Sequence, residues 1–228
     1  MRRLLTILVA VTCALAARAQ DDGFRFWGDE ALSIGYNRNY GLYSEDVSVV
    51  GFDSRRLNAS AGINIHSVLN AFTLDGLWKR QSGGHSFGVE TFGLARWSRA
   101  YNFQEYSLGA LGVWSWGKRV EARAGTFFKW ITPLNGSGTD FEPLNFAYSL
   151  SFWALPLEKK FNFGASLSNL DYFTAERFYC PMLCVNLNYA INNHYIVYVR
   201  WREHNSGIFD ITSNTYDRQF RIGTIVQW

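Results

Sequence analysis

The last twelve residues of the chain, Asp217 to Trp228, constrain its fold most strongly. They read DRQFRIGTIVQW, and apolar or β-branched side chains recur at every second position from Phe220 to Trp228. The positions between carry Gln219, Arg221, Gly223 and Gln227, and Ile225 is the one apolar exception. Successive side chains of a β-strand point to opposite faces of the sheet. The segment is therefore predicted to be a strand with one apolar face and one polar face.

A chain that stops on Trp228 after this alternation resembles the closing strand of a Gram-negative outer-membrane β-barrel. The resemblance implies an outer-membrane location, a wall surrounded by outer-membrane lipid, and delivery to the barrel-insertion machinery, for which the terminal aromatic residue is the signal. The alternative is an edge strand of a soluble all-β domain.

The opposite end of the chain indicates export from the cytoplasm. Arg2 and Arg3 precede an apolar run from Leu4 to Ala16, and Ala17-Arg18-Ala19 places small residues where a signal peptidase reads them. The run is shorter than the ~20 residues that cross a bilayer as a helix. We predict a signal peptide at 1–19 and a single domain at 20–228.

Composition agrees with a barrel. The chain has 22 Lys and Arg against 19 Asp and Glu, but Arg2, Arg3 and Arg18 fall in the signal peptide, so the mature chain is neutral with histidine uncharged. The net charge therefore gives no reason to expect nucleic-acid binding. Aromatic residues make up 17% of the chain, yet its mean hydropathy is only −0.11. In a membrane barrel, apolar lipid-facing residues alternate with polar lumen-facing ones, so the mean hydropathy of the chain stays near zero.

Alternating patterns predict an all-β protein, a transmembrane antiparallel up-and-down barrel of twelve strands. Ten strands is an alternative count, because the region before Arg55 also reads as a plug or periplasmic lead-in, and eight is a further one. The expected strands are 31–38, 46–52, 57–66, 72–80, 87–97, 104–116, 119–130, 144–152, 161–168, 183–189, 195–202 and 217–228. Short turns at 81–84, 117–118, 156–159 and 191–193 fall on one side, and longer loops at 131–142, 170–179 and 203–216 fall on the other. All four prolines are expected at strand ends or in connections.

Six tryptophans fall on the apolar face near predicted strand ends. Indole favours the membrane interface, so we expect two aromatic belts. These residues are Trp78, Trp116 and Trp228 at the periplasmic end, and Trp97, Trp130 and Trp201 at the external end.

The inward positions carry most of the information on function. The assigned basic residues there are Arg96, Arg119, Arg123, Lys129, Arg200, Arg202 and Arg221, and the assigned acidic residues are Asp75, Glu90 and Glu121. Rings of basic side chains select anions in pores. We therefore predict a narrow porin-like channel for small polar or anionic solutes. The strand count, size and inward arginines resemble those of small barrels that pass acidic oligosaccharides.

Two alternatives remain open. Cross-strand Arg–Glu pairs, together with the inward aromatic residues Phe127, Trp153 and Tyr198, would equally suit a closed structural or accessory barrel. An outer-membrane lipid hydrolase is the other alternative. The sequence feature that suggests a hydrolase is the pair His204 and Ser206, two residues apart. In the alternation of the strand, however, both fall on the face that points to the lumen rather than to lipid.

The remaining chemistry-bearing residues predict no further site. The four histidines and the cysteines lack metal-ligand spacing, and no glycine-rich phosphate loop follows a strand, so neither a metal nor a cofactor is expected. Cys180 and Cys184 are four residues apart, about 13 Å along an extended strand, which is too far for a disulfide without a turn. Two free thiols are expected, or a disulfide if the strand starts later than residue 183.

Overall fold

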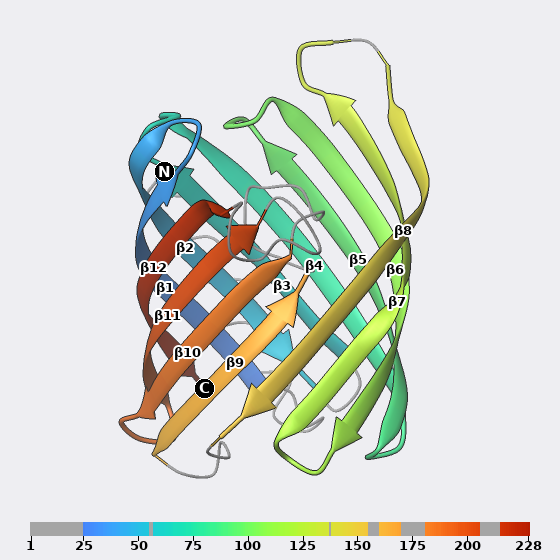
Figure 1. Ribbon diagram of the computed structural model, residues 1–228, viewed down its shortest axis with the longest axis vertical. Helices are drawn as coiled ribbons and strands as arrows, with labels where there is room; N and C mark the ends of the chain where they lie inside the picture. The colour runs from blue at the N-terminus through green and yellow to red at the C-terminus, as the bar shows by residue number, and fades with distance from the viewer. Residues whose placement is uncertain (1–24, 55–56, 137, 155–159, 170–180, 206–214) are drawn as a thin grey trace.

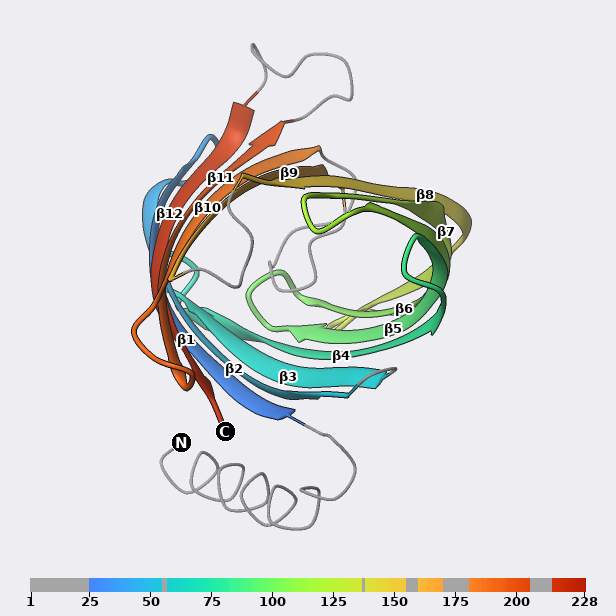
Figure 2. The same ribbon diagram turned by 90° about the horizontal axis from the view of Figure 1, so that it is seen from below.

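The computed structural model describes residues 25–54, 57–136, 138–154, 160–169, 181–205 and 215–228. Within these residues the chain forms twelve antiparallel strands in one closed barrel (Figure 1), and the strands enclose the interior completely when the barrel is seen from below (Figure 2). The strands are β1 (Arg25–Asn37), β2 (Gly41–Asp53), β3 (Leu57–His66), β4 (Ala71–Gly83), β5 (Phe87–Ser98), β6 (Phe103–Trp116), β7 (Val120–Pro133), β8 (Asp140–Trp153), β9 (Phe161–Ser168), β10 (Met182–Ala190), β11 (Tyr195–Asn205) and β12 (Thr215–Gln227). The predicted fold class and the count of twelve are confirmed.

Pairing of the first strand with the last closes the barrel. The register of β1 and β12 runs from Trp27 opposite Gln227 to Asn37 opposite Asp217. Every other strand pairs with its neighbours in sequence, as in an up-and-down barrel. No helix among the described residues is long and apolar enough to cross a membrane.

The two ends of the barrel differ in their connections. We call the end that holds Arg25 and Trp228 the terminal end, and the opposite end the loop end (bottom and top of Figure 1). Turns at 84–86, 117–119 and 191–194 join strands at the terminal end. At the loop end, the connections 38–40, 67–70, 99–102 and 134–139 are also short. The predicted loop 170–179, and most of the loop 203–216, lie outside the described residues, as does the predicted signal peptide.

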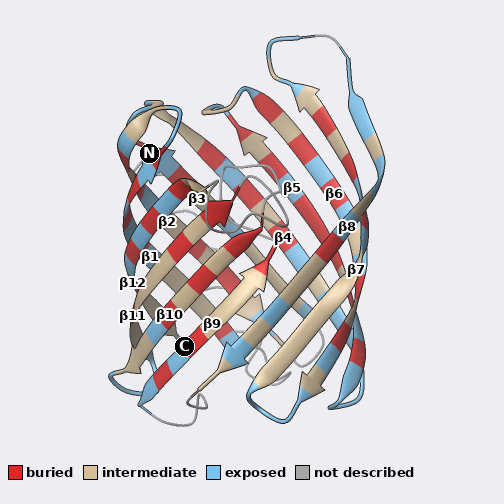
Figure 3. Cartoon of the chain, in the orientation of Figure 1, coloured by how far each residue is buried: buried red, intermediate tan, exposed pale blue. Residues whose placement is uncertain are grey.

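Burial alternates along the strands (Figure 3). In β1, Leu32 and Ile34 expose 57% and 59% of their surface, whereas Ser33 between them is fully buried. Apolar side chains thus cover the outer wall and polar ones turn inward, the inverse of a soluble protein.

The first two strands are longer than predicted. The sequence indicated 31–38 and 46–52, but β1 begins at Arg25 and β2 spans Gly41–Asp53. Glu30 and Ser44 are polar yet take outward positions in these strands, and this interrupts the alternation on which the prediction relied.

Half of the predicted loop 131–142 is strand. β7 continues to Pro133 and β8 begins at Asp140. Pro143 lies inside β8 rather than at its end, where the register with β7 shifts and two residues of β8 oppose the single residue Phe128. Such a bulge accommodates proline, because the bulged residue makes no ladder hydrogen bond.

Candidate functional site: the barrel interior

Contacts between strands that are not neighbours identify the inward face. Glu45 in β2 accepts a hydrogen bond from Gln219 in β12 at 2.5 Å, across the intervening β1. Arg123 in β7 lies 3.2 Å from Glu90 in β5, across β6. Side chains on the concave side of a small barrel converge in this way, whereas outward ones diverge.

A polar cluster occupies the loop end of β1, β2, β11 and β12. The Tyr43 hydroxyl donates to both oxygens of Asp217, at 2.9 and 3.0 Å, and Asn37 donates to the same carboxylate at 3.2 Å. His204 Nδ1 lies 3.4 Å from it. The ring of Tyr43 crosses β1 directly over Gly35, where a Cβ would stand 2.3 Å from the ring. Only glycine leaves room for this arrangement.

Three arginines lie together on β11 and β12. Arg200 and Arg221 are cross-strand partners, and Arg202 follows on the same inward face. Arg221 donates to Ser33 at 2.8 Å, and Glu45 lies 3.7 Å from it. Like charges placed directly opposite each other repel, so this pairing needs compensation from neighbouring groups.

Arg200 is compensated by neutral groups. Its Nε donates to the amide oxygen of Asn186 at 2.5 Å, and its guanidinium carbon lies 4.9 Å from the centre of the Tyr198 ring. The Tyr198 hydroxyl donates to Asp29 at 2.9 Å. Among the described residues, no carboxylate lies within salt-bridge distance of Arg200, which is half-buried.

The opposite wall holds its basic groups in ion pairs. Arg96 Nε lies 2.6 Å from Asp75, and both side chains are almost fully buried. On the same wall, buried Lys129 lies 3.6 Å from Glu142. These pairs join adjacent strands, β4 to β5 and β7 to β8.

Arg123 lies nearer the terminal end and contacts two acids. It is 2.9 Å from Glu121 in its own strand and 3.2 Å from Glu90. Its positive charge is therefore matched by two ion pairs, whereas Arg200 has no carboxylate within salt-bridge distance among the described residues.

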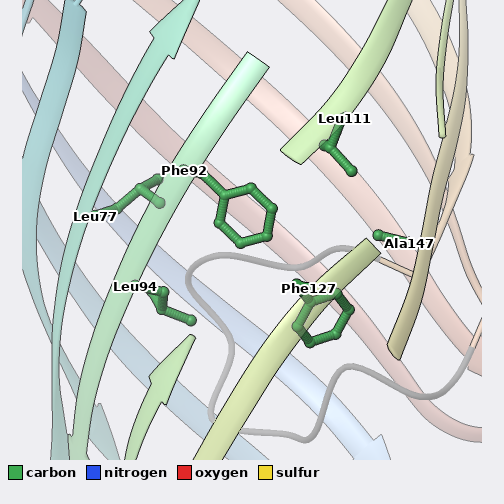
Figure 4. Close-up of a cluster of buried hydrophobic side chains, with 6 residues drawn as sticks. All are labelled: Leu77, Phe92, Leu94, Leu111, Phe127 and Ala147. Atoms are coloured by element: carbon green, nitrogen blue, oxygen red, sulfur yellow. The ribbon is translucent and has the colours of Figure 1, made fainter. Parts of the chain in front are cut away.

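An apolar layer lies on the same wall, and Figure 4 shows its side chains. It comprises Leu77, Phe92, Leu94, Leu111, Phe127 and Ala147, which come from β4 to β8 and expose at most 6% of their surface. A second buried apolar cluster lies on the β1, β2 and β11 side and comprises Ala31, Val47, Val49 and Tyr198. Inward apolar side chains at mid-height narrow the space that water and ions could occupy.

The structure corrects the predicted excess of positive charge. Arg119 lies in the turn before β7, where it is exposed, because the strand starts one residue later than predicted. Leaving aside the first and last residue of each strand, the described inward basic residues are Lys79, Arg96, Arg123, Lys129, Arg200, Arg202 and Arg221. The inward acidic residues are Asp29, Glu45, Asp75, Glu90, Glu105, Glu121, Glu142 and Asp217. The interior is thus nearly balanced. The three arginines of β11 and β12 lie side by side, and among the described residues Arg200 has no carboxylate within salt-bridge distance.

Several inward acidic residues were not assigned from the sequence, and some of them could have been predicted from the alternation alone. Glu105 and Asp217 had inward parity in strands that were predicted, so counting every inward position would have included them. Asp29 and Glu45 lie in parts of β1 and β2 that the prediction left out, and Glu142 was assigned to a loop.

The six predicted belt tryptophans all occupy outward positions. Trp78, Trp116 and Trp228 are exposed, and Trp97, Trp130 and Trp201 are half-exposed. The latter three lie within four residues of the loop ends of their strands. Their contact with a membrane interface stays a prediction.

The predicted hydrolase pair and the cysteines fall partly outside the described residues. His204 is buried in the interior beside Asp217, as its parity predicted, and Ser206 is not described. Cys184 is a free, buried thiol whose sulfur lies 3.6 Å from Asn186 Oδ1, and Cys180 is not described.

Comparison with known proteins identifies relatives in fold. No protein-family model and no curated protein matches the sequence. The KdgM porin in complex with disordered oligogalacturonate superposes with a TM-score of 0.62 at 9% identity, covering 88% of this chain and 98% of that one. The NanC porin gives 0.55 at 15% identity, covering 86% and 98%. The translocator domain of autotransporter NalP from Neisseria meningitidis gives 0.53 at 12% identity, covering 98% and 96%. This chain therefore has the fold of the twelve-stranded outer-membrane β-barrels.

Proposed function

We propose that this protein is a narrow porin-like channel of a Gram-negative outer membrane that passes small polar solutes and favours anionic ones. The observation that carries the proposal is the arginine cluster Arg200, Arg202 and Arg221. Glu45 is the one described acid within salt-bridge distance of Arg200 or Arg221, and it lies near Arg221. A guanidinium without a carboxylate partner offers hydrogen-bond donors to a passing carboxylate or phosphate.

The fold relatives support the class of function without fixing the solute. Two of them are porins, and one of those was solved with oligogalacturonate. A sugar acid is the type of solute that a half-buried arginine would attract. We carry this class of solute over to the present chain as part of the proposal.

Conductance of the refolded mature protein in a planar bilayer tests the proposal. Steady steps are expected, with a reversal potential in a salt gradient that indicates preference for anions. Arg200→Glu should remove or invert that preference, because it reverses the charge that lacks an acidic partner. Arg218→Glu is the control, since Arg218 is outward, exposed and near the loop end. It should leave the selectivity unchanged.

A closed accessory barrel is the second candidate, and the apolar layer favours it. Six buried apolar side chains at mid-height, flanked by ion pairs between strands, are also what a filled interior would contain. A correctly inserted protein that produces no conductance steps would refute the channel and support this second candidate.

A further inference from the structure

The outer wall of β1 and β2 carries acidic groups at mid-height. Glu30 and Asp46 both point outward and are exposed, and each lies five residues from the nearer end of its thirteen-residue strand. With a tilt near 40°, five residues correspond to about 12 Å, half of the ~25 Å apolar band of an outer-membrane barrel. Both carboxyl groups therefore lie near the centre of that band.

No other part of the described outer wall is charged at this height. The remaining outward charged residues of the strands lie within three residues of a strand end: Arg80, Glu203 and Arg218. Within β1 and β2 themselves, apolar outward residues bracket the acids on both sides. Ile34 and Leu42 lie toward the loop end, and Val50 and Phe52 lie toward the terminal end. The acids are thus an interruption of the apolar band rather than its edge.

Serines extend the polar strip. Ser48 is the cross-strand partner of Glu30 and donates a hydrogen bond to its carboxylate at 2.6 Å. Ser44 continues the outward row beyond Asp46. Among the described residues, neither Glu30 nor Asp46 has a cationic partner within salt-bridge distance. Ionisable groups inside a membrane are costly and usually face a partner rather than lipid.

A groove lies on the outer wall of β4 to β7, separated from the acidic strands β1 and β2 by β3. It has a volume of about 490 Å³ and is lined on β4 to β7 by outward residues that include Gly76, Gly93, Ala95, Tyr106 and Trp130. Ala61 of β3, opposite Val50 of β2, connects the groove floor to the acidic strands. Small residues let another backbone approach closely within a membrane.

We propose that the outer wall of β1 to β7 is the docking surface for a second membrane protein that presents a lysine or arginine at mid-membrane depth. Charge complementarity determines the choice of partner. A symmetric contact with a second copy would bring the four carboxylates together, and the described outer wall has no basic residue at this height to receive them. The basic side chain of the partner binds Glu30 and Asp46, and its apolar side chains fill the groove.

Site-specific photocrosslinking in the native host tests this inference. A benzophenone amino acid replaces Val50, between the acids and the groove. In the matched control it replaces Leu150, which is 51% exposed on β8 of the opposite wall. Position 50 should give an adduct with another protein, and the crosslinked residue of that protein should lie next to a membrane-embedded lysine or arginine of the same protein. Position 150 should give lipid adducts only.

Charge-neutralising variants complete the test. Glu30→Gln together with Asp46→Asn should reduce the adduct at position 50 at least tenfold while the heat-dependent gel shift of the folded barrel is retained. Asp46→Lys combined with a basic-to-acidic change in the partner should restore it. Lipid adducts alone at position 50 would overturn the inference, as would an adduct to a second copy of this chain. The conductance of the purified protein should not change in these variants. The proposed docking surface and the proposed channel can therefore be refuted independently of each other.

Discussion

Replacing Arg96 with methionine tests how the barrel wall is held together. The Arg96–Asp75 contact is 2.6 Å long, and the two side chains are 0% and 3% exposed. At an effective dielectric constant of about 20, unit charges at that distance attract by roughly 6 kcal/mol, but their desolvation offsets much of this gain. Loss of one partner leaves the other charge buried. We therefore expect Arg96→Met to lower the free energy of unfolding by about 3–5 kcal/mol.

The assay is urea unfolding of the barrel refolded in lipid vesicles, followed by tryptophan fluorescence. The double variant Arg96→Met with Asp75→Leu should lose less stability than the single variant, since it leaves no unpaired charge. Arg218→Met is the surface control. Arg218 is 61% exposed and 3.4 Å from Glu203, so its loss should change the free energy by less than about 1 kcal/mol. A loss below about 1 kcal/mol for Arg96→Met, or a double variant less stable than the single one, would refute the reasoning.

Three further substitutions probe other parts of the interior and wall. Tyr43→Phe removes a bifurcated hydrogen bond to a buried carboxylate and should cost about 1.5–3 kcal/mol in the same urea assay; no change in the midpoint would contradict the assigned contact. Phe127→Ala should cost about 3–5 kcal/mol by opening a cavity in the apolar layer, and in the channel it should raise conductance. Gly93→Ala places a Cβ 2.1 Å from the Trp78 indole and should alter the near-ultraviolet circular dichroism, whereas Gly76→Ala, 3.9 Å from its nearest neighbour, should not.

The fold was predictable because lipid outside and polar groups inside impose a period of two on every strand. The predictions were most accurate where this alternation is unbroken, as in β3 and β9, whose bounds match the predicted 57–66 and 161–168. They failed where function or geometry breaks the pattern. The outward acid Glu30 concealed the true length of β1, and the bulge at Pro143 shifted the parity of β8 and made its first residues read as a loop.

The interior was predictable only in part. Parity placed Arg96, Arg200 and Arg221 inward, but it says nothing about which groups meet. The pairing of Arg200 with Arg221 depends on the register of β11 and β12, and the contact of Arg123 with Glu90 depends on curvature across β6. Both are properties of the closed barrel as a whole rather than of any strand pattern.

Closure by β1 and β12 makes the first and last strands depend on each other. The carbonyl and amide groups along one edge of β1 are paired by β12, and no water is available in a bilayer to replace that pairing. A chain lacking β12 would present two open edges, on β1 and β11, to lipid or to another chain. Insertion therefore cannot be completed strand by strand from the amino-terminal end. The first strand stays half-bonded until the last one arrives, so a chain that stalls before β12 is a target for degradation or for pairing with a foreign strand.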